Sequence, residues 1–351
     1  MSVIDYRPYR ADDEPGLRDL FRAVYGPDAD RRTSAWRYLA PAPYPAVIQI
    51  AETGGRIVGA QPAHGIDLLI CGDPVKGLLL LDVMTHPEYR RRGILKGVVE
   101  GLRERAAAEG YRVLLTTPNR DAEHGFARLP AWTRMGELVP WVGIGDAATL
   151  LAAGGRAGAL LRPFASPWRR LTRHRHAETA DETTRDPGDR FTAALWTATA
   201  ATAICQLVRD TTFMSWRFGT GSGRPYTFSG AGTADQPEAL AVSGVGRFIG
   251  HDVVTLVDLV APPGSTAAGA HLLRTLAARA ARERRAAVVG WFAPGSGAEN
   301  VLRRAGFIRV PKLLRPRPYS VWGACDLPER ARQSALTLHS WSMSLADSDL
   351  A

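Results

Sequence analysis

The chain has 351 residues, of which 45% are hydrophobic and 23% charged, and its formal net charge is +9. This composition excludes a disordered chain, and no apolar run approaches the length needed to span a bilayer. The length is large for a single hydrophobic core, so two domains are expected.

Cysteine usage and the N-terminus indicate a cytoplasmic protein. The three cysteines, Cys71, Cys205 and Cys325, are far apart in sequence and lack the spacing of metal ligands or of a disulfide framework. The first ten residues lack the apolar stretch of a signal peptide. We therefore expect reduced thiols, no bound metal and no membrane partner.

Apolar spacing predicts an alternation of strands and helices in the first half, in the order strand, helix, three strands, helix, strand. The strands are predicted at residues 3–6, 46–52, 56–69, 78–83 and 113–117, and the helices at 12–24 and from 93 onward. Residues 78–83 form an apolar run interrupted only by Asp82, which is typical of a strand buried on both faces. In the second helix, apolar residues recur at helical spacing, namely Ile94, Leu95, Val98, Val99, Leu102 and Ala106.

The turn between that strand and that helix is strongly basic. Arg90, Arg91 and Arg92 precede Gly93, where the helix begins. The first-turn N–H groups of a helix have no intrahelical partner, the helix dipole adds positive charge, and arginine matches phosphate geometry. The turn therefore predicts a phosphate site, with a solvated basic turn as the alternative.

The order apolar strand, Thr85-His86-Pro87, Tyr89-Arg90-Arg91-Arg92-Gly93-Ile94-Leu95, amphipathic helix and apolar strand resembles the acyl-CoA-binding core of the GNAT N-acetyltransferase superfamily. The triple arginine resembles the tandem-GNAT, Eis-like branch, although Leu95 stands where the family usually has a small residue. The resemblance covers roughly residues 45–140. It implies acetyl-CoA as cosubstrate, no metal, and a small-molecule amine as acceptor, with no nucleic acid expected.

The resemblance also implies roles for individual residues. Backbone groups of Met84 and Thr85 would hold the thioester and pantetheine, and Asn119 would meet the pantetheine arm. The pyrophosphate would be held by the turn, that is by Arg90, Arg91, Arg92, Gly93, Ile94 and Leu95. His86 is expected to shape this turn.

Candidates for proton transfer are few. The family often supplies a tyrosine as the acid for the leaving thiolate, but the matching segment here has none, and His124 is the nearest group that titrates near neutral pH. Asp82 is a candidate base acting through a water, and is equally readable as structural. The Trp36-Arg37-Tyr38 cluster could line the acceptor pocket or serve a core.

The second half echoes the first and suggests a duplicated unit. Trp36-Arg37-Tyr38 is echoed by Trp216-Arg217-Phe218, and Leu81-Asp82-Val83 by Val257-Asp258-Leu259, after which a helix, a strand at 286–292 and a final helix and strand at 300–307 are predicted. The turn at 262–269 has no arginine, so we expect this half to be degenerate.

The fold class expected is therefore α/β (α+β), with two tandem GNAT-like domains whose mixed central sheets are flanked by helices. The expected divisions are a catalytic domain at 1–145, a polar linker at 146–190, a second domain at 191–327 and a tail at 328–351. His174 and His176 in the linker lack the further ligands that a metal site needs.

The tail alternates apolar and polar residues from 336 to 345. This pattern predicts a strand or an ordered extended segment that packs Trp341 against the body. In Eis-like relatives the terminal carboxylate helps to take the amine proton, so Asp347, Asp349 and the carboxylate of Ala351 could play that part. The alternative is an edge strand with a solvated acidic end.

Two other classes of function stay open from the sequence. A Fem-like aminoacyl-tRNA-dependent transferase would also be a basic tandem protein, although an arginine-rich turn fits it poorly. A noncatalytic acyl-CoA-binding protein would keep the turn and lack proton-transfer groups.

Overall fold

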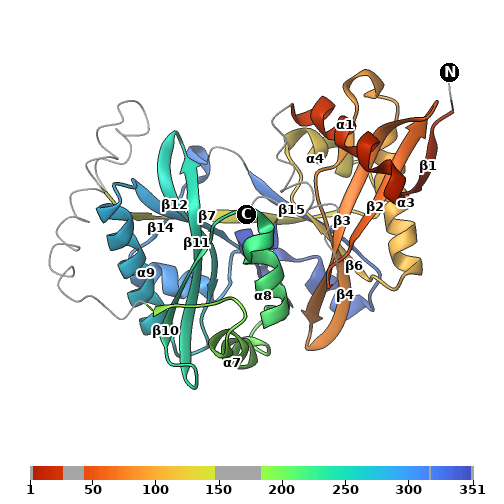
Figure 1. The fold of residues 1–351 in the computed structure, drawn as a ribbon. Coiled ribbons are helices and arrows are strands. Elements are labelled where there is room, and N and C mark those ends of the chain that lie inside the picture. Colours follow the sequence, from red (N-terminus) through yellow and green to blue (C-terminus); the bar gives the residue numbers. More distant parts are fainter. Residues whose placement is uncertain (1–2, 27–42, 147–182, 316–317, 349–351) are drawn as a thin grey trace.

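The computed structural model describes residues 3–26, 43–146, 183–315 and 318–348. These residues form a sixteen-stranded mixed sheet flanked by helices (Figure 1). The predicted mixed α/β class is confirmed.

The elements alternate along the chain much as the hydrophobic pattern predicts. The strands are β1 (Asp5–Pro8), β2 (Ala46–Thr53), β3 (Arg56–Ile70), β4 (Asp73–Leu80), β5 (Met84–Thr85), β6 (Val113–Thr116), β7 (Thr133–Ile144), β8 (Thr183–Thr184), β9 (Cys205–Leu207), β10 (Thr227–Gly232), β11 (Pro237–Phe248), β12 (His251–Val260), β13 (Ala287–Phe292), β14 (Ile308–Arg309), β15 (Tyr319–Cys325) and β16 (Trp341–Ser342). The helices are α1 (Glu14–Tyr25), α3 (Ile94–Ala108), α4 (Arg120–Phe126), α7 (Arg190–Thr199), α8 (Thr211–Phe218), α9 (Thr266–Arg282), α10 (Ala298–Ala305) and α11 (Glu329–Ala335). Short 3-10 segments lie at η1 (Ala11–Asp13), η2 (Pro87–Tyr89), η3 (Thr220–Ser222), η4 (Lys312–Leu314), η5 (Leu338–Ser340) and η6 (Leu345–Asp347).

Two strand–helix–strand units have the same layout. In the first half β4 and β6 pair in parallel with α3 between them in sequence, and in the second half β12 and β13 pair in parallel with α9 between them. The apolar stripe of α3 packs on the first sheet as predicted, since Val98, Val99 and Leu102 are fully buried together with Leu78 and Leu80. A parallel pair needs a crossover connection, which these helices provide.

Strands β7 and β15 join the sheet of the first half to the sheet of the second half (Figure 1). The sheet order is β1-β2-β3-β4-β6-β15-β7-β13-β12-β11-β10-β8. Strand β7 pairs with β15 through its first part and with β13 through its second, and β15, from the second half, also pairs with β6. The described residues therefore form one continuous sheet in which the two halves interleave.

The strand predicted at 78–83 begins and ends earlier than expected, since β4 spans Asp73–Leu80. Its ladder with β6 ends at Leu80, and Asp82 has a φ of 27°, which breaks the extended conformation. Aspartate tolerates this left-handed region better than most residues do. The apolar run alone gave no sign of the break, because Leu81 and Val83 continue the pattern of a buried strand.

The tail is ordered and packs Trp341 against the body, as predicted. The Trp341 side chain is 1% exposed and its Nε1–H donates to the Ala335 carbonyl oxygen at 3.0 Å. The tail is not one long strand, however. Only Trp341 and Ser342 pair in a ladder, with β9, and the flanking turns are 3-10 segments, one of them capped by the Ser344 side chain.

Candidate active site

The parallel ladder of β4 and β6 stops at the pair Leu80 and Thr116, where both strands end. The chain turns through residues 81–83, and β5 then pairs with β3. Within the described ranges β5 has no other ladder partner. Successive residues of a strand direct their backbone groups to opposite sides, and the His86 N–H donates to β3, so Met84 faces β3 and Thr85 faces away from it. The backbone N–H and C=O groups of Thr85 are therefore available to an extended polar ligand.

Helix α3 follows β5 and η2 and begins with an uncapped N-terminus. Its N-cap is Gly93, with a φ of 78° and no side-chain cap, and Arg91, two residues earlier, has a φ of 65°. A Cβ added at Gly93 would meet nothing within 4 Å, so the space beside the N-cap is open. The partial positive charge of the first turn is not neutralised by an acidic residue of that turn.

Three exposed guanidinium groups surround this helix end, contributed by Arg90, Arg91 and Arg92. The Arg92 guanidinium is partly engaged, because its Nη2 donates to the Glu88 carbonyl oxygen at 3.3 Å and it lies 4.8 Å from the Tyr89 ring centre. Arg90 and Arg91 form no ion pair with any described residue. Two guanidinium groups are therefore left for an anionic ligand.

His86 holds the turn in place. The ring is buried, the Glu88 N–H donates to its Nδ1 at 3.3 Å, and its Nε2 lies 2.7 Å from Arg56 Nη2. Both ring nitrogens are thus engaged by neighbours in the turn and on β3. These contacts support the structural role expected for His86.

The short helix α4 lies beside the start of α3. Leu95 occupies the space that a Cβ on Gly125 would need, since that Cβ would lie 2.8 Å from the Leu95 Cδ atoms. The large residue at the family's usual small position is thus accommodated by a glycine on the neighbouring helix. The spacing of apolar residues along either helix could not have predicted the contact between Leu95 and Gly125, because it joins two helices.

The two polar candidates of α4 are both exposed. Asn119 is its N-cap, with Oδ1 accepting the Ala122 N–H at 2.9 Å, so its amide nitrogen is the group left for a ligand. His124 has Nδ1 at 2.8 Å from the Arg120 carbonyl oxygen. This contact places the ring hydrogen on Nδ1 and leaves Nε2 to exchange a proton.

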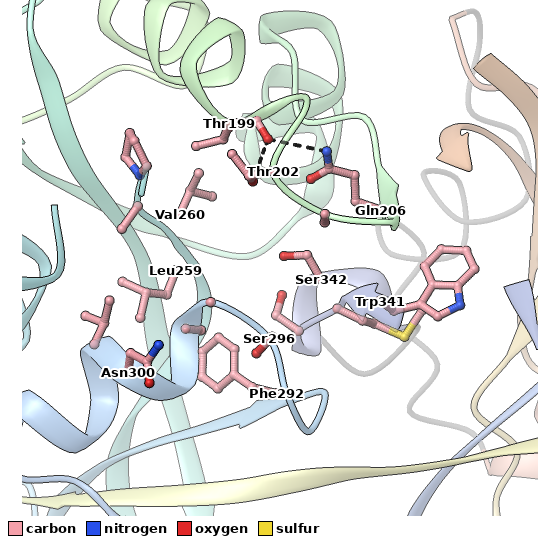
Figure 2. Close-up of a pocket in the computed structure, with 18 of the residues that line it drawn as sticks. Thr199, Thr202, Gln206, Leu259, Val260, Phe292, Ser296, Asn300, Trp341 and Ser342 are labelled. Carbon is pink, nitrogen blue, oxygen red and sulfur yellow. Dashed lines mark hydrogen bonds between the residues drawn. The ribbon is translucent and has the colours of Figure 1, made fainter. Parts of the chain in front are cut away.

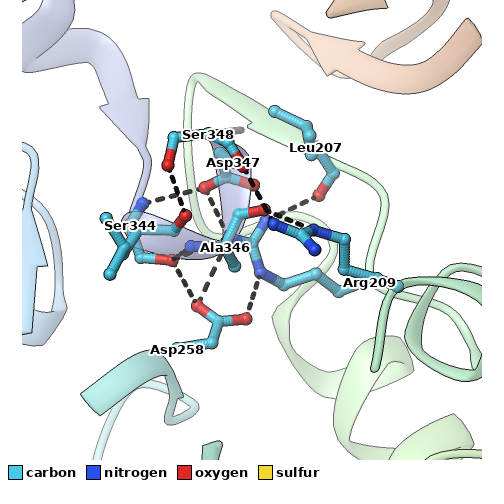
Figure 3. A network of polar contacts seen from close by, with 9 residues as sticks. Leu207, Arg209, Asp258, Ser344, Ala346, Asp347 and Ser348 are labelled. Atoms are coloured by element: carbon cyan, nitrogen blue, oxygen red, sulfur yellow. Dashed lines mark hydrogen bonds and ion pairs between the residues drawn. The ribbon is translucent and has the colours of Figure 1, made fainter. Parts of the chain in front are cut away.

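Asp347 of the tail was expected either to take the amine proton or to lie in a solvated acidic end. The structure shows it in a buried network of ion pairs (Figure 3). It is 1% exposed, and its Oδ2 accepts from Arg209 Nη2 at 2.6 Å, while Arg209 Nε donates to Asp258 Oδ2 at 2.8 Å. Asp347 is therefore a buried ion-pair partner, neither solvated nor a free base. Asp349, Ala351 and the Trp36-Arg37-Tyr38 cluster lie outside the described residues.

The ion-pair network has perturbed pKa values. Burial by itself would lower the pKa of Arg209, but the Asp258 and Asp347 carboxylates raise it above its ordinary value. Burial raises the pKa of Asp347, and the Arg209 guanidinium opposes that rise. Arg209 is therefore charged at all accessible pH values, and its removal would leave two carboxylates in a dry site.

Comparisons with known proteins agree with this geometry. Residues 5–130 match the family described as acetyltransferase (GNAT) domain. Two GCN5-related N-acetyltransferases have similar structures. The one from Anabaena variabilis ATCC 29413 is 10% identical, with a TM-score of 0.64 over 92% of this chain and 72% of its own. The one from Kribbella flavida is 15% identical, with a TM-score of 0.58 over 92% and 70%. No curated protein matches the sequence.

The family match covers the N-terminal part of the chain, and the fold as a whole is GNAT-like. Both similarities support a transferase. No helix in the described ranges is long and apolar enough to cross a membrane. In those same ranges no group of three or more His, Cys, Asp or Glu side chains could hold a metal ion.

Proposed function

We propose that this protein transfers an acetyl group from acetyl-CoA to the amine of a small molecule. The observation that carries the proposal is the uncapped start of α3, which faces open space beside the guanidinium groups of Arg90 and Arg91. A diphosphate is the ligand that this combination of N–H groups, helix dipole and forked cations suits best.

The neighbouring groups extend the same ligand path. Residues 90–95 would hold the pyrophosphate, the Asn119 amide would meet the pantetheine arm, and the backbone groups of Thr85 would orient the thioester. The neutral amine would then attack the thioester carbonyl carbon, forming the amide bond as the carbon–sulfur bond breaks. The amine loses a proton and the thiolate gains one, and most of the rate gain would come from positioning and electrostatics.

The proposal is tested by incubating the purified protein with acetyl-CoA and a panel of amino sugars, amino acids and polyamines, with free thiol as the readout. Amine-dependent release of thiol supports it. Turnover that requires added RNA would favour a Fem-like aminoacyl-tRNA-dependent transferase instead. Tight binding of acetyl-CoA with no turnover of any amine would favour a noncatalytic acyl-CoA-binding protein.

His124 is proposed as the acid that protonates the leaving thiolate, with Asp82 as a base acting through water. Replacing His124 with glutamine is expected to lower kcat about 100-fold, which is typical of a lost general acid, without changing the affinity for acetyl-CoA. Steady-state kinetics and calorimetric titration with acetyl-CoA, run on both proteins, check it. An unchanged kcat would remove His124 from the mechanism.

We further propose a tandem, Eis-like arrangement in which only the N-terminal unit binds CoA. The unit β12-α9-β13 repeats the layout of β4-α3-β6, but its turn from residue 262 to residue 269 contains no arginine. Calorimetric titration with acetyl-CoA is therefore expected to give one site per chain. Two equivalent sites would contradict this arrangement.

A further inference from the structure

A cavity of about 490 Å³ lies in the second half of the protein (Figure 2). It opens at the carboxyl ends of β12 and β13, with Leu259, Val260 and Phe292 in its wall. The starts of α9 and α10 also line it, through Thr266 and Ala298. Its size is that of a site for a small organic ligand.

Both helices reach the cavity with uncapped N-termini. Ser265 precedes α9 without capping it through its side chain, and the first turn of α9 holds no acidic residue. Gly297 precedes α10 and provides no side-chain cap, but Glu299 in the first turn offsets the dipole and its N–H donates to the Ser296 carbonyl oxygen at 3.0 Å. The start of α9 is therefore the end that directs uncompensated positive charge and unpaired first-turn N–H groups toward the cavity.

Ser296 gives a second and independent sign of a ligand. Its side chain lines the cavity and the residue is 8% exposed, yet its hydroxyl has no hydrogen-bond partner among the described residues. Buried hydroxyl groups are nearly always paired, because an unmade hydrogen bond in a dry site is costly. The Ser296 hydroxyl is therefore available to hydrogen-bond a molecule bound in the cavity.

The charges around the cavity limit the ligand to a single negative group. Arg209 and Asp258 line it, but they bind each other, and Asp258 also accepts the Ser344 hydroxyl at 2.7 Å. Asp347, on the far side of Arg209, is not part of the lining. The other polar lining is neutral apart from His339, which is exposed, and comprises hydroxyl and amide groups of Thr199, Thr202, Gln206, Asn300 and Ser342.

We propose that this cavity binds a small monocarboxylate that carries hydroxyl or amide groups. Its carboxylate lies at the start of α9, within reach of the Ser296 hydroxyl, and its neutral substituents meet the side chains of the opposite wall. The start of α9 supplies about half a positive charge, which suits a monoanion and falls short of a diphosphate. The site is thus distinct from the arginine turn of α3 and does not depend on the function proposed above.

The test compares acids with matched neutral molecules. Tryptophan fluorescence and calorimetry follow the titration of the purified protein with gluconate against sorbitol, lactate against lactamide, and inorganic phosphate. At least one acid is expected to bind at millimolar concentration while its neutral counterpart does not. Binding of the neutral partners with equal strength, tighter binding of phosphate, or binding of neither acid would overturn the proposal.

Variants of cavity residues test whether the measured binding of the acid occurs in this cavity. Thr266→Asp places a carboxylate at the start of α9, where it favours the helix and so preserves the fold, but it occupies the place of the ligand. Acid binding is expected to weaken by more than about 100-fold in this variant and about tenfold in Ser296→Ala. Thr266→Ser is the control and should bind the acid as the wild type does. Acid binding that survives Thr266→Asp would place the site elsewhere and overturn the assignment.

Discussion

Replacing Gly93 with aspartate is expected to abolish acetyl-CoA binding, with a loss of affinity of at least about 100-fold. The new carboxylate would stand at the uncapped start of α3, in space that is open in the ligand-free structure. It would both compensate the helix dipole and repel the incoming phosphates. Calorimetric titration with acetyl-CoA measures the effect.

Gly93→Asn is the matched control for this variant. Asparagine has the shape of aspartate and tolerates the same positive φ, so the difference between the two variants isolates the charge. Gly93→Asn should retain part of the affinity. Equal affinities for the wild type and Gly93→Asp would refute the phosphate site.

The arginines of the turn provide a second route to the same result. Changing Arg90 and Arg91 together to glutamine keeps hydrogen-bonding side chains but removes two charges. Charge-assisted hydrogen bonds contribute about 1.5–3 kcal/mol each, so the double variant is expected to bind acetyl-CoA at least tenfold less tightly. Retention of wild-type affinity would show that the guanidinium groups face solvent in the complex.

Replacing Arg209 with methionine is expected to lower the free energy of unfolding by about 3–5 kcal/mol, which is typical when one partner of a buried pair is removed. Arg209 is 7% exposed and joins three separate segments, since it binds Asp258 of β12 and Asp347 of the tail from its place after β9. Without it, two carboxylates would remain in a dry site. Urea denaturation followed by circular dichroism measures the loss.

Two controls separate this effect from a general loss of charge. Arg190 pairs with Asp235 at 3.4 Å, but both side chains are more than four-fifths exposed, so Arg190→Met should change stability by less than about 1 kcal/mol. Asp347→Asn removes one of the two carboxylates while leaving an acceptor for Arg209, so it should destabilise far less than Arg209→Met. An Arg209→Met variant as stable as Arg190→Met would show that the ion pairs of Arg209 contribute little to holding the tail.

Elements set by local pattern were predictable from the sequence. Helix α3 follows from apolar residues such as Val98 and Leu102 at helical spacing, and its start follows from Gly93 after a basic turn. Strands β2 and β3 begin and end within one residue of the predicted limits, because a Gly-Gly turn separates two apolar runs. Each of these signals lies within a few residues of the element that it defines.

Features that depend on remote pairing were not predictable. The insertion of β15 between β6 and β7 joins residues that are about two hundred positions apart in the chain, and hydrophobic periodicity carries no information about which strand pairs with which. The break at Asp82 was hidden for a related reason. It lies where the register with β3 shifts, since Leu80 is opposite Ala63 and Met84 is opposite Ala60, and such a shift is a property of the sheet.

The sequence by itself therefore determined the class of fold and the basic turn before α3, because both rest on local spacing and on the chemistry of adjacent residues. Only the tertiary structure decided the state of Asp347, since an acidic residue near a chain end reads as solvated until Arg209 is seen to bind it. The presence of the cavity beside Ser296 also follows only from the tertiary structure. Its walls come from segments that meet only when the chain has folded, so no stretch of sequence contains it.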